Sequence, residues 1–209
     1  MPPDFLTAHT RIAPVAFVPE VLLHQADEPI GLWERTEAED GGRQPPPFWA
    51  FAWAGGQALA RFVLDQPALV AGRTVLDLAT GSGLVAIAAA LAGASVSVND
   101  IDPRSLTAAR ANALANGVTL RLVEGDLLDT PEESDVVLAG DVCYSREMAE
   151  RVLPFLRRAA GRGSLVLLGD PGRAYLPDGL IPRAVYEVPV SEALESVAVR
   201  RTTVWQVPV

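Results

Sequence analysis

Between residues 74 and 169, short apolar runs alternate with stretches whose apolar residues recur at helical spacing. The helical stretches cover 84–92, 103–116 and 146–160, and Pro154 is expected to kink the last of them. Such alternation predicts an α/β fold with a mainly parallel sheet, because parallel strands need a crossover between them. The predicted strands are TVLDL (74–78), SVSVN (95–99), TLRLVE (119–124), DVVLAG (135–140) and SLVLLG (164–169).

The two ends of the chain depart from this alternation. AVYEVPV (184–190) and VRRTTVWQV (199–207) predict two strands without a long helix between them, so we expect an antiparallel pair. Residues 1–44 hold one candidate strand within 15–26, and then a charged stretch that continues into glycines and prolines. The sequence therefore predicts an N-terminal extension and linker over 1–44, and one domain over 45–209 that begins with a helix near 55–64.

The charge balance narrows the classes of partner. The 209 residues include 17 basic residues, all of them arginine, and 26 acidic residues, which gives a net charge of −9. Such a chain lacks the basic footprint that nucleic-acid phosphates need. With one cysteine and two histidines, neither an internal disulfide nor a metal centre is expected. We expect a protein or small-molecule partner, with no nucleic acid, membrane or metal.

Residues 78–99 contain no charged side chain, and the run is long enough to suggest a membrane span. Their glycines and hydroxyl side chains, and a change of period midway, favour a strand, a turn, a helix and a second strand instead. The first residues, MPPDFLTAHTR, lack the basic and then apolar build of a signal peptide. A cytoplasmic protein is therefore expected.

The segment VLDLATGSGLVAIAAALA (75–92) places a turn of small residues between a strand and a helix. Gly81 and Gly83 would let a ligand approach the backbone and the N–H groups at the helix start. Their spacing also fits a dinucleotide site, so an NAD-binding oxidoreductase or binding module stays open. Asp77 would repel a pyrophosphate and suit a ligand with a cationic amine, such as S-adenosylmethionine; the alternative is that it caps the turn.

Acidic residues follow the next two strands as well. Asp100 would accept hydrogen bonds from the ribose hydroxyls of either class of cofactor. Asp126 would reach an adenine amino group, or else belong to a turn. Asp102 is expected to cap a helix that begins at Pro103 and closes at Gly117.

The sequence AGDVCY (139–144) ends another apolar run at an acid. Asp141 would attract and orient a protonated amine, and Tyr144 would hydrogen-bond it or close the pocket. The alternative is a helix-terminal acid and a core tyrosine. Cys143 is expected to be a buried packing residue, because no histidine lies nearby in sequence to activate a thiol. Enzymes that methylate the exocyclic amines of nucleobases resemble one another in having two prolines after the acid. This chain has Val142 and Cys143 there instead, so a nucleobase pocket is disfavoured.

Taken together, VLDLATGSG, VNDIDP, EGD and AGDVCY resemble class I S-adenosylmethionine-dependent methyltransferases. The resemblance implies a Rossmann-like, seven-stranded, mostly parallel sheet with helices on both faces and a C-terminal antiparallel hairpin. It also implies S-adenosyl-L-methionine as methyl donor and S-adenosyl-L-homocysteine as product. Ala79 stands where many members have the first glycine of the loop, which bears on the local backbone angles.

A narrower resemblance lies in PPPFWAFAWAGGQALARFVLD (45–65), LLGDPGR (167–173) and TTVW (202–205). These segments are similar to the lysine methyltransferases that act on the electron transfer flavoprotein beta subunit. The resemblance implies protein-lysine N-methylation, with that subunit as partner. The alternatives are an enzyme of the same fold acting on a ribosomal protein or a small amine and, from other classes, the NAD-binding protein above or a non-catalytic interaction protein.

The resemblance also assigns site residues. Asp141 and Tyr144 are the expected catalytic pair. The expected cofactor-binding residues are Trp53, Gly55, Gln57, Asp77, Ala79, Gly81, Gly83, Asp100, Ile101, Asp126, Leu127 and Gly140. The expected substrate-binding residues are Trp49, Asp141, Tyr144, Asp170 and Arg173.

Four of these assignments carry a more detailed expectation. Trp53 would lie beside the cofactor, and with Phe48 and Trp49 it would offer aromatic faces to a methylated ammonium group. Asp170 and Arg173 would either touch the substrate or form an ion pair that holds the loop after the fifth strand.

Overall fold

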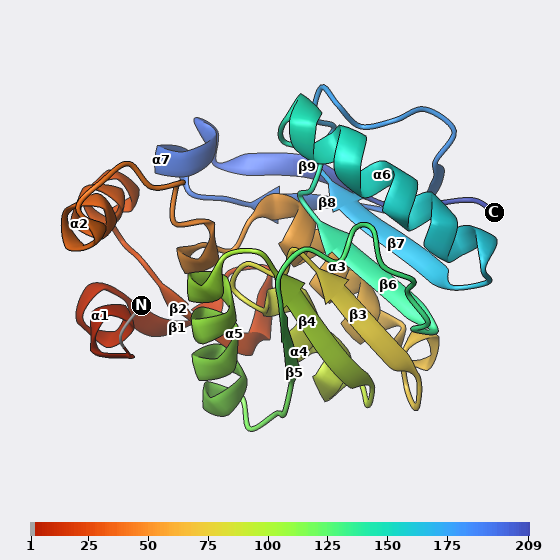
Figure 1. The fold of residues 1–209 in the computed structure, drawn as a ribbon, viewed down its shortest axis with the longest axis horizontal. Coiled ribbons are helices and arrows are strands. Elements are labelled where there is room, and N and C mark those ends of the chain that lie inside the picture. Colours follow the sequence, from red (N-terminus) through yellow and green to blue (C-terminus); the bar gives the residue numbers. More distant parts are fainter. Residues whose placement is uncertain (1–2) are drawn as a thin grey trace.

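The central sheet of the computed structural model has seven strands, of which the first five run parallel and the last two form an antiparallel hairpin (Figure 1). Its strands are β3 (Thr74–Leu78), β4 (Ser95–Asp100), β5 (Arg121–Glu124), β6 (Val136–Gly140), β7 (Leu165–Asp170), β8 (Ile181–Pro189) and β9 (Val199–Gln206). Their order in the sheet is β5-β4-β3-β6-β7-β9-β8. The structure describes residues 3–209, without the side chains of residues 3, 4, 29, 40, 193 and 194. The predicted fold class is confirmed.

Helices cover both faces of this sheet (Figure 1). On one face lie α3 (Ala54–Asp65), α4 (Leu84–Leu91) and α5 (Pro103–Ala115), and on the other lies α6 (Arg146–Gly161). Successive residues of β6 serve the two cores in turn: Val136 and Leu138 pack with α3 and α4, whereas Val137 and Ala139 pack with α6. A continuous apolar strand is what two covered faces require.

Most predicted boundaries agree with the structure to within a few residues. The Asp102 carboxylate accepts the Arg104 N–H at 2.9 Å and so caps α5, and Gly117 has the left-handed φ of +65° expected after its end. The predicted strand over 119–124 is shorter, because β5 is an edge strand that pairs with β4 only from Arg121 onward. The uncharged run 78–99 folds as the end of β3, a turn, α4 and most of β4. None of the described helices combines the length and apolar character that a membrane crossing needs.

The N-terminal part contains more structure than the sequence predicted. Its elements are α1 (Pro3–His9), β1 (Arg11–Val15), β2 (Val18–Gln25) and α2 (Pro29–Asp40). The single strand expected within 15–26 is the second strand of a hairpin, and α2 occupies part of the predicted linker. The hairpin packs through Val15, Val18, Val21 and Leu23 on apolar residues of α3 and α4. The domain boundary at residue 44 stays a prediction.

The first turn of α3 touches the sheet backbone to backbone. A Cβ on Gly55 would lie 2.2 Å from the Gly169 carbonyl oxygen, and one on Gly140 would lie 2.9 Å from the Gly56 Cα. No side chain fits at such distances. This glycine seam, formed by Gly55, Gly56, Gly140 and Gly169, fixes the start of α3 against the carboxyl ends of β6 and β7.

The left-handed backbone at Ala79, with φ of +54°, gives a test of the turn after β3. This conformation costs an L-residue about 1–2 kcal/mol, whereas glycine loses about 0.5–1 kcal/mol through its freedom in the unfolded chain. We expect Ala79→Gly to raise the free energy of unfolding by about 0.5–1 kcal/mol in urea titrations. Ala111→Gly within α5 is the matched control and should lower it by about 1 kcal/mol. A destabilised Ala79→Gly protein would contradict the strained turn.

Candidate active site

A cavity of about 900 Å³ opens at the carboxyl ends of β3, β4 and β6. Segment 44–53 and the start of α6 form its other walls. Its volume lies in the range of sites for ligands of drug or cofactor size. The predicted site residues that line it are Trp53, Asp77, Ala79, Gly81, Asp100, Ile101, Asp126, Gly140, Asp141, Tyr144 and Arg173.

Three of the predicted cofactor-binding residues have packing roles instead of lining this cavity. Gly55 belongs to the glycine seam described above. Gly83 lies against α5, where a Cβ would stand 3.0 Å from that of Ala109. Leu127 packs on the core under α6, and its neighbour Leu128 reaches the cavity instead. The structure shows a packing contact for each of the three, and their role in cofactor binding stays a prediction.

Three further assigned residues have side chains that are buried outside this cavity, so their binding roles stay predictions. Gln57 accepts the Phe17 N–H and donates to the carbonyl oxygens of Ala52 and Pro189, away from the cavity. Trp49 is 1% exposed in an apolar cluster with residues of α1, α2 and α5. Asp170 is fully buried.

Two acids, the buried Asp77 and the half-buried Asp100, hold the turn after β3 from either side. Asp77 Oδ2 accepts the Thr80 hydroxyl at 2.5 Å and the Ala86 N–H at 3.1 Å, so this residue both caps the turn and lines the cavity. Burial raises the pKa of Asp77 to about 7, against the opposing effect of those hydrogen bonds. Asp100 Oδ2 accepts the Gly81 N–H at 3.0 Å. Burial raises the pKa of Asp100 as well.

Asp126 lies in a different setting, at the open side of the cavity. It accepts the Leu128 N–H at 3.0 Å and pairs with Arg151 at 2.6 Å. The backbone hydrogen bond, and then Arg151, lower the pKa of this carboxyl. The structure therefore shows Asp126 in a turn, as its alternative interpretation predicted, and also in an ion pair with Arg151.

The charges on the cavity wall indicate which cofactor the site fits. Its acidic side chains are Asp77, Asp100, Asp102, Asp126, Asp141 and Glu147, and its basic ones are Arg104, Arg151 and Arg173. This excess of acids attracts a cationic ligand and repels a pyrophosphate. The residues present therefore fit S-adenosylmethionine better than a nicotinamide dinucleotide.

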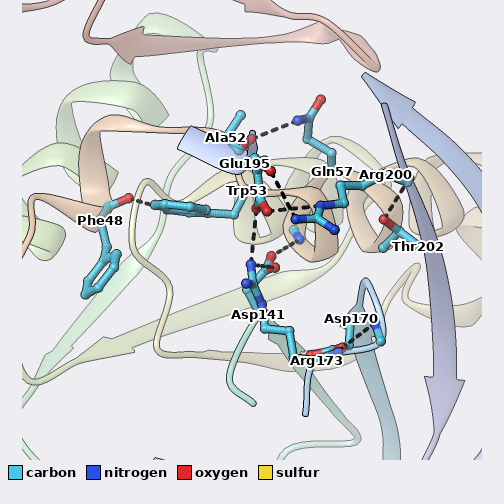
Figure 2. Close-up of polar contacts among 12 residues, drawn as sticks. Phe48, Ala52, Trp53, Gln57, Asp141, Asp170, Arg173, Glu195, Arg200 and Thr202 are labelled. Atoms are coloured by element: carbon cyan, nitrogen blue, oxygen red, sulfur yellow. Dashed lines mark hydrogen bonds and ion pairs between the residues drawn. The ribbon is translucent and has the colours of Figure 1, made fainter. Parts of the chain in front are cut away.

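An aromatic wall, made of Phe48, Trp53 and Tyr144, closes the cavity beside Asp141. The Trp53 indole N–H donates to the Phe48 carbonyl oxygen at 3.0 Å, as Figure 2 shows. The Phe48 ring lies 5.8 Å from that of Trp53 and 5.4 Å from that of Tyr144, centroid to centroid. Tyr144 is 47% exposed, so the expectation of a core tyrosine is wrong. Burial raises its pKa, and its hydroxyl stays protonated at neutral pH.

Asp141 lies where β6 ends, with a left-handed φ of +55°. Its N–H donates to the Gly169 carbonyl oxygen at 2.9 Å, and its Oδ2 accepts the Gly56 N–H at 2.8 Å. Its Oδ1 pairs with Arg173 Nη2 at 3.1 Å (Figure 2). Burial raises the pKa of Asp141 to about 6, against the opposing effect of Arg173.

The structure does not show the ion pair with Asp170 that was one of the two roles predicted for Arg173. Asp170 Oδ1 accepts the backbone N–H groups of Gly172 and Arg173, each at 2.7 Å, and so shapes the loop. The Arg173 guanidinium pairs instead with Asp141 and with Glu195, at 3.2 Å. The expected ion pair between Asp170 and Arg173 is therefore corrected to a backbone turn. Glu195 was missed because its segment, SEALES, carries no pattern that points to a site.

Cys143, between the two expected catalytic residues, is fully buried. Burial raises the pKa of its thiol to about 12, so the reactive thiolate is absent at neutral pH. The prediction that it packs is confirmed.

The raised pKa of Asp77 predicts a pH-dependent stability. Asp77 keeps its proton up to about pH 7 in the folded chain, but loses it near 3.9 in the unfolded chain. Between about pH 4 and 7 the folded state binds the extra proton, so the wild-type free energy of unfolding loses this contribution as pH rises. Asp77→Asn removes that dependence. Its stability relative to wild type should rise from pH 4 to 7 and then level off, whereas a constant difference in urea titrations would contradict the assignment.

Comparisons with known proteins agree with this geometry. The family model for ribosomal protein L11 methyltransferase (PrmA) matches residues 58–156, from α3 to α6. Among solved structures, the ribosomal protein L11 methylase from Lactobacillus delbrueckii subsp. bulgaricus superposes with a TM-score of 0.51 at 24% identity, covering 76% of this chain and 81% of that one. Magnesium protoporphyrin IX methyltransferase from Synechocystis PCC 6803, with bound SAM, superposes with a TM-score of 0.53 at 20% identity. That match covers 72% of this chain and 77% of the other. These likenesses concern the fold.

Closer similarity is found to curated sequences. The electron transfer flavoprotein beta subunit lysine methyltransferase of Danio rerio is 35% identical over 97% of this chain and 82% of its own length. The Xenopus laevis enzyme is 36% identical over 98% of this chain and 86% of its own length. The Homo sapiens enzyme is 32% identical over 96% of this chain and 80% of its own length. Since the similarity spans nearly all of this chain and most of each relative, the chain belongs to the family of electron transfer flavoprotein beta subunit lysine methyltransferases.

Proposed function

We propose that this protein transfers a methyl group from S-adenosylmethionine to the side-chain nitrogen of a lysine in a folded protein, and that this acceptor is the electron transfer flavoprotein beta subunit of the same cell. The observation that carries the proposal is the Asp141 carboxylate, which is 11% exposed and lines the same cavity as three aromatic rings. The names of the relatives support the choice of acceptor.

The acceptor nitrogen sets the chemical problem. A lysine amine has a pKa of about 10.4 and arrives protonated, but only its lone pair attacks a methyl group. Asp141 attracts and orients this cation. With its own pKa raised to about 6, it is also a better proton acceptor than an ordinary carboxylate. Burial of the amine works in the same direction, because a low dielectric disfavours its charged form.

The remaining cavity residues bind the cofactor and shield the reacting groups from water. S-adenosylmethionine supplies, when bound, a methyl group on a sulfonium centre. Asp100 would hold its ribose hydroxyls, and Asp77 and the turn at Gly81 would face its amino-acid part. The aromatic wall excludes water, and its ring faces favour a methylated ammonium group.

Asp141→Asn keeps the shape of the side chain but removes its charge. We expect methyl transfer to fall by about 10²-fold or more. The affinity for S-adenosylmethionine, measured by calorimetry, should change by less than about 1 kcal/mol, because Asp77 and Asp100 are untouched. Tyr144→Phe should reduce methyl transfer less than Asp141→Asn does, because the aromatic ring is kept and only one hydrogen bond is lost.

Two variants serve as controls for this series. Asp129→Asn makes the same change at an exposed position outside the cavity, and Cys143→Ala removes the buried thiol. Both should keep near wild-type activity. An active Asp141→Asn protein together with an inactive Cys143→Ala protein would refute the role of Asp141 and favour a thiol mechanism.

The acceptor is tested directly with purified proteins. Incubation with the flavoprotein and labelled S-adenosylmethionine should give methylated lysine peptides in mass spectrometry, and the rate should fall as salt rises, because the net charge of −9 attracts a basic surface. Ribosomal protein L11 is the comparison acceptor, because its methyltransferase family model matches residues 58–156. Methylated L11 with an unmodified flavoprotein would overturn the choice of acceptor.

A further inference from the structure

One nitrogen of Arg173 lies between two carboxylates. Its Nη2 is 3.1 Å from Asp141 Oδ1 and 3.2 Å from Glu195 Oε1 (Figure 2). The Arg173 Nε is buried and has no hydrogen-bond partner among the described residues. The guanidinium therefore already contacts Asp141, the carboxylate that the proposed function gives to the acceptor's ammonium group.

Both carboxylates are anchored by their other oxygen. Asp141 Oδ2 accepts the Gly56 N–H at 2.8 Å. Glu195 Oε2 accepts Arg200 Nε at 3.2 Å, and the Glu195 carbonyl oxygen accepts Arg200 Nη2 at 3.0 Å. Glu195 ends the short helix α7 (Glu192–Glu195), between β8 and β9, and its side chain is 6% exposed. Neither carboxylate needs to turn if Arg173 moves from one to the other.

A second cation at Asp141 makes that movement necessary. A lysine ammonium at Oδ1 would stand beside the Arg173 guanidinium, and two like charges repel strongly away from water. The charged groups around Arg173 are Asp141, Asp170, Glu195 and, behind Glu195, Arg200. Asp170 Oδ1 accepts backbone N–H groups and Asp170 Oδ2 has no hydrogen-bond partner among the described residues, whereas Glu195 already binds the guanidinium from the other side.

We propose that Glu195 is a positioning residue for the acceptor: it retains Arg173 when the lysine ammonium takes the place of the guanidinium at Asp141. The inference rests on the proposed function and adds a residue to it. Arg173 breaks one contact in this exchange and keeps another, so it need not enter solvent. Glu195 acts through Arg173 and does not touch the acceptor.

Glu195→Gln tests the proposal, because the amide keeps the shape but loses the charge. Arg173 should then stay at Asp141 and compete with the acceptor. We expect the KM for the acceptor protein to rise about 10-fold, on the order of the loss of one charged contact, while kcat stays within about threefold. Glu192→Gln, an exposed change on the same short helix, is the matched control and should leave both constants at wild-type values.

A second variant separates this role from a merely structural one. In Glu195→Gln with Arg173→Met the competing cation is gone, so the KM should return to within about threefold of wild type at pH 8, where Asp141 is ionised. A KM that stays as high as in the single variant would overturn the proposal, as would an unchanged KM in Glu195→Gln. Thermal unfolding of each variant identifies any loss of fold.

A measurement without turnover completes the test. Carbon-13 NMR of labelled aspartate carboxyls, with Asp141→Asn for assignment, follows the pKa of Asp141 in the free protein. In Glu195→Gln that pKa should fall, because the guanidinium stays at Asp141 and a neighbouring negative charge is lost. An unchanged or higher pKa would refute the role of Glu195. A flavoprotein that wild type leaves unmethylated would instead defeat the proposed acceptor, so the two failures are distinguishable.

Discussion

The carboxylate of Asp141 connects four parts of the chain. It follows β6, accepts an N–H from the start of α3, pairs with the loop after β7 through Arg173, and reaches α7 through Glu195. A buried carboxylate is stable only with such partners, and the removal of one partner leaves a charge without compensation. The same bonds that satisfy Asp141 therefore place the aromatic segment before α3 and the C-terminal hairpin around one carboxylate group.

Costly conformations gather in the same region. In the part of the chain that the structure describes, the non-glycine residues with left-handed backbone are Ala79, Asp141 and Ser196. The first two line the cavity, and the third follows Glu195 directly. Backbone strain of this kind persists where surrounding contacts hold it, and it concentrates at functional sites. The raised pKa values of Asp77, Asp100 and Asp141 add an electrostatic cost at the same place.

The sequence predicted the parallel sheet and its helices, because buried strands and amphipathic helices leave periodic apolar patterns. It predicted Asp77, Asp100 and Asp141 as site residues because each lies at the end of an apolar strand or directly after it. It did not predict α2, where Leu32 and Thr36 are the buried residues among those whose side chains the structure describes and the apolar pattern is faint. Gln57 was assigned from the family resemblance, which does not say where its side chain points; here it bonds Phe17, Ala52 and Pro189. Glu195 was missed because its role depends on a loop that brings it to Arg173 from 22 positions away.

The glycine seam limits how this enzyme can diverge. Backbone meets backbone at this seam, and a methyl group added at Gly55, Gly140 or Gly169 would displace α3 from the sheet. Related enzymes that acquire a new acceptor can therefore vary the cavity wall, for example in segment 44–53, but they cannot replace the clashing glycines of the seam. Selection would leave glycine at these positions as the most lasting mark of common ancestry, even after the residues that choose the acceptor have been replaced.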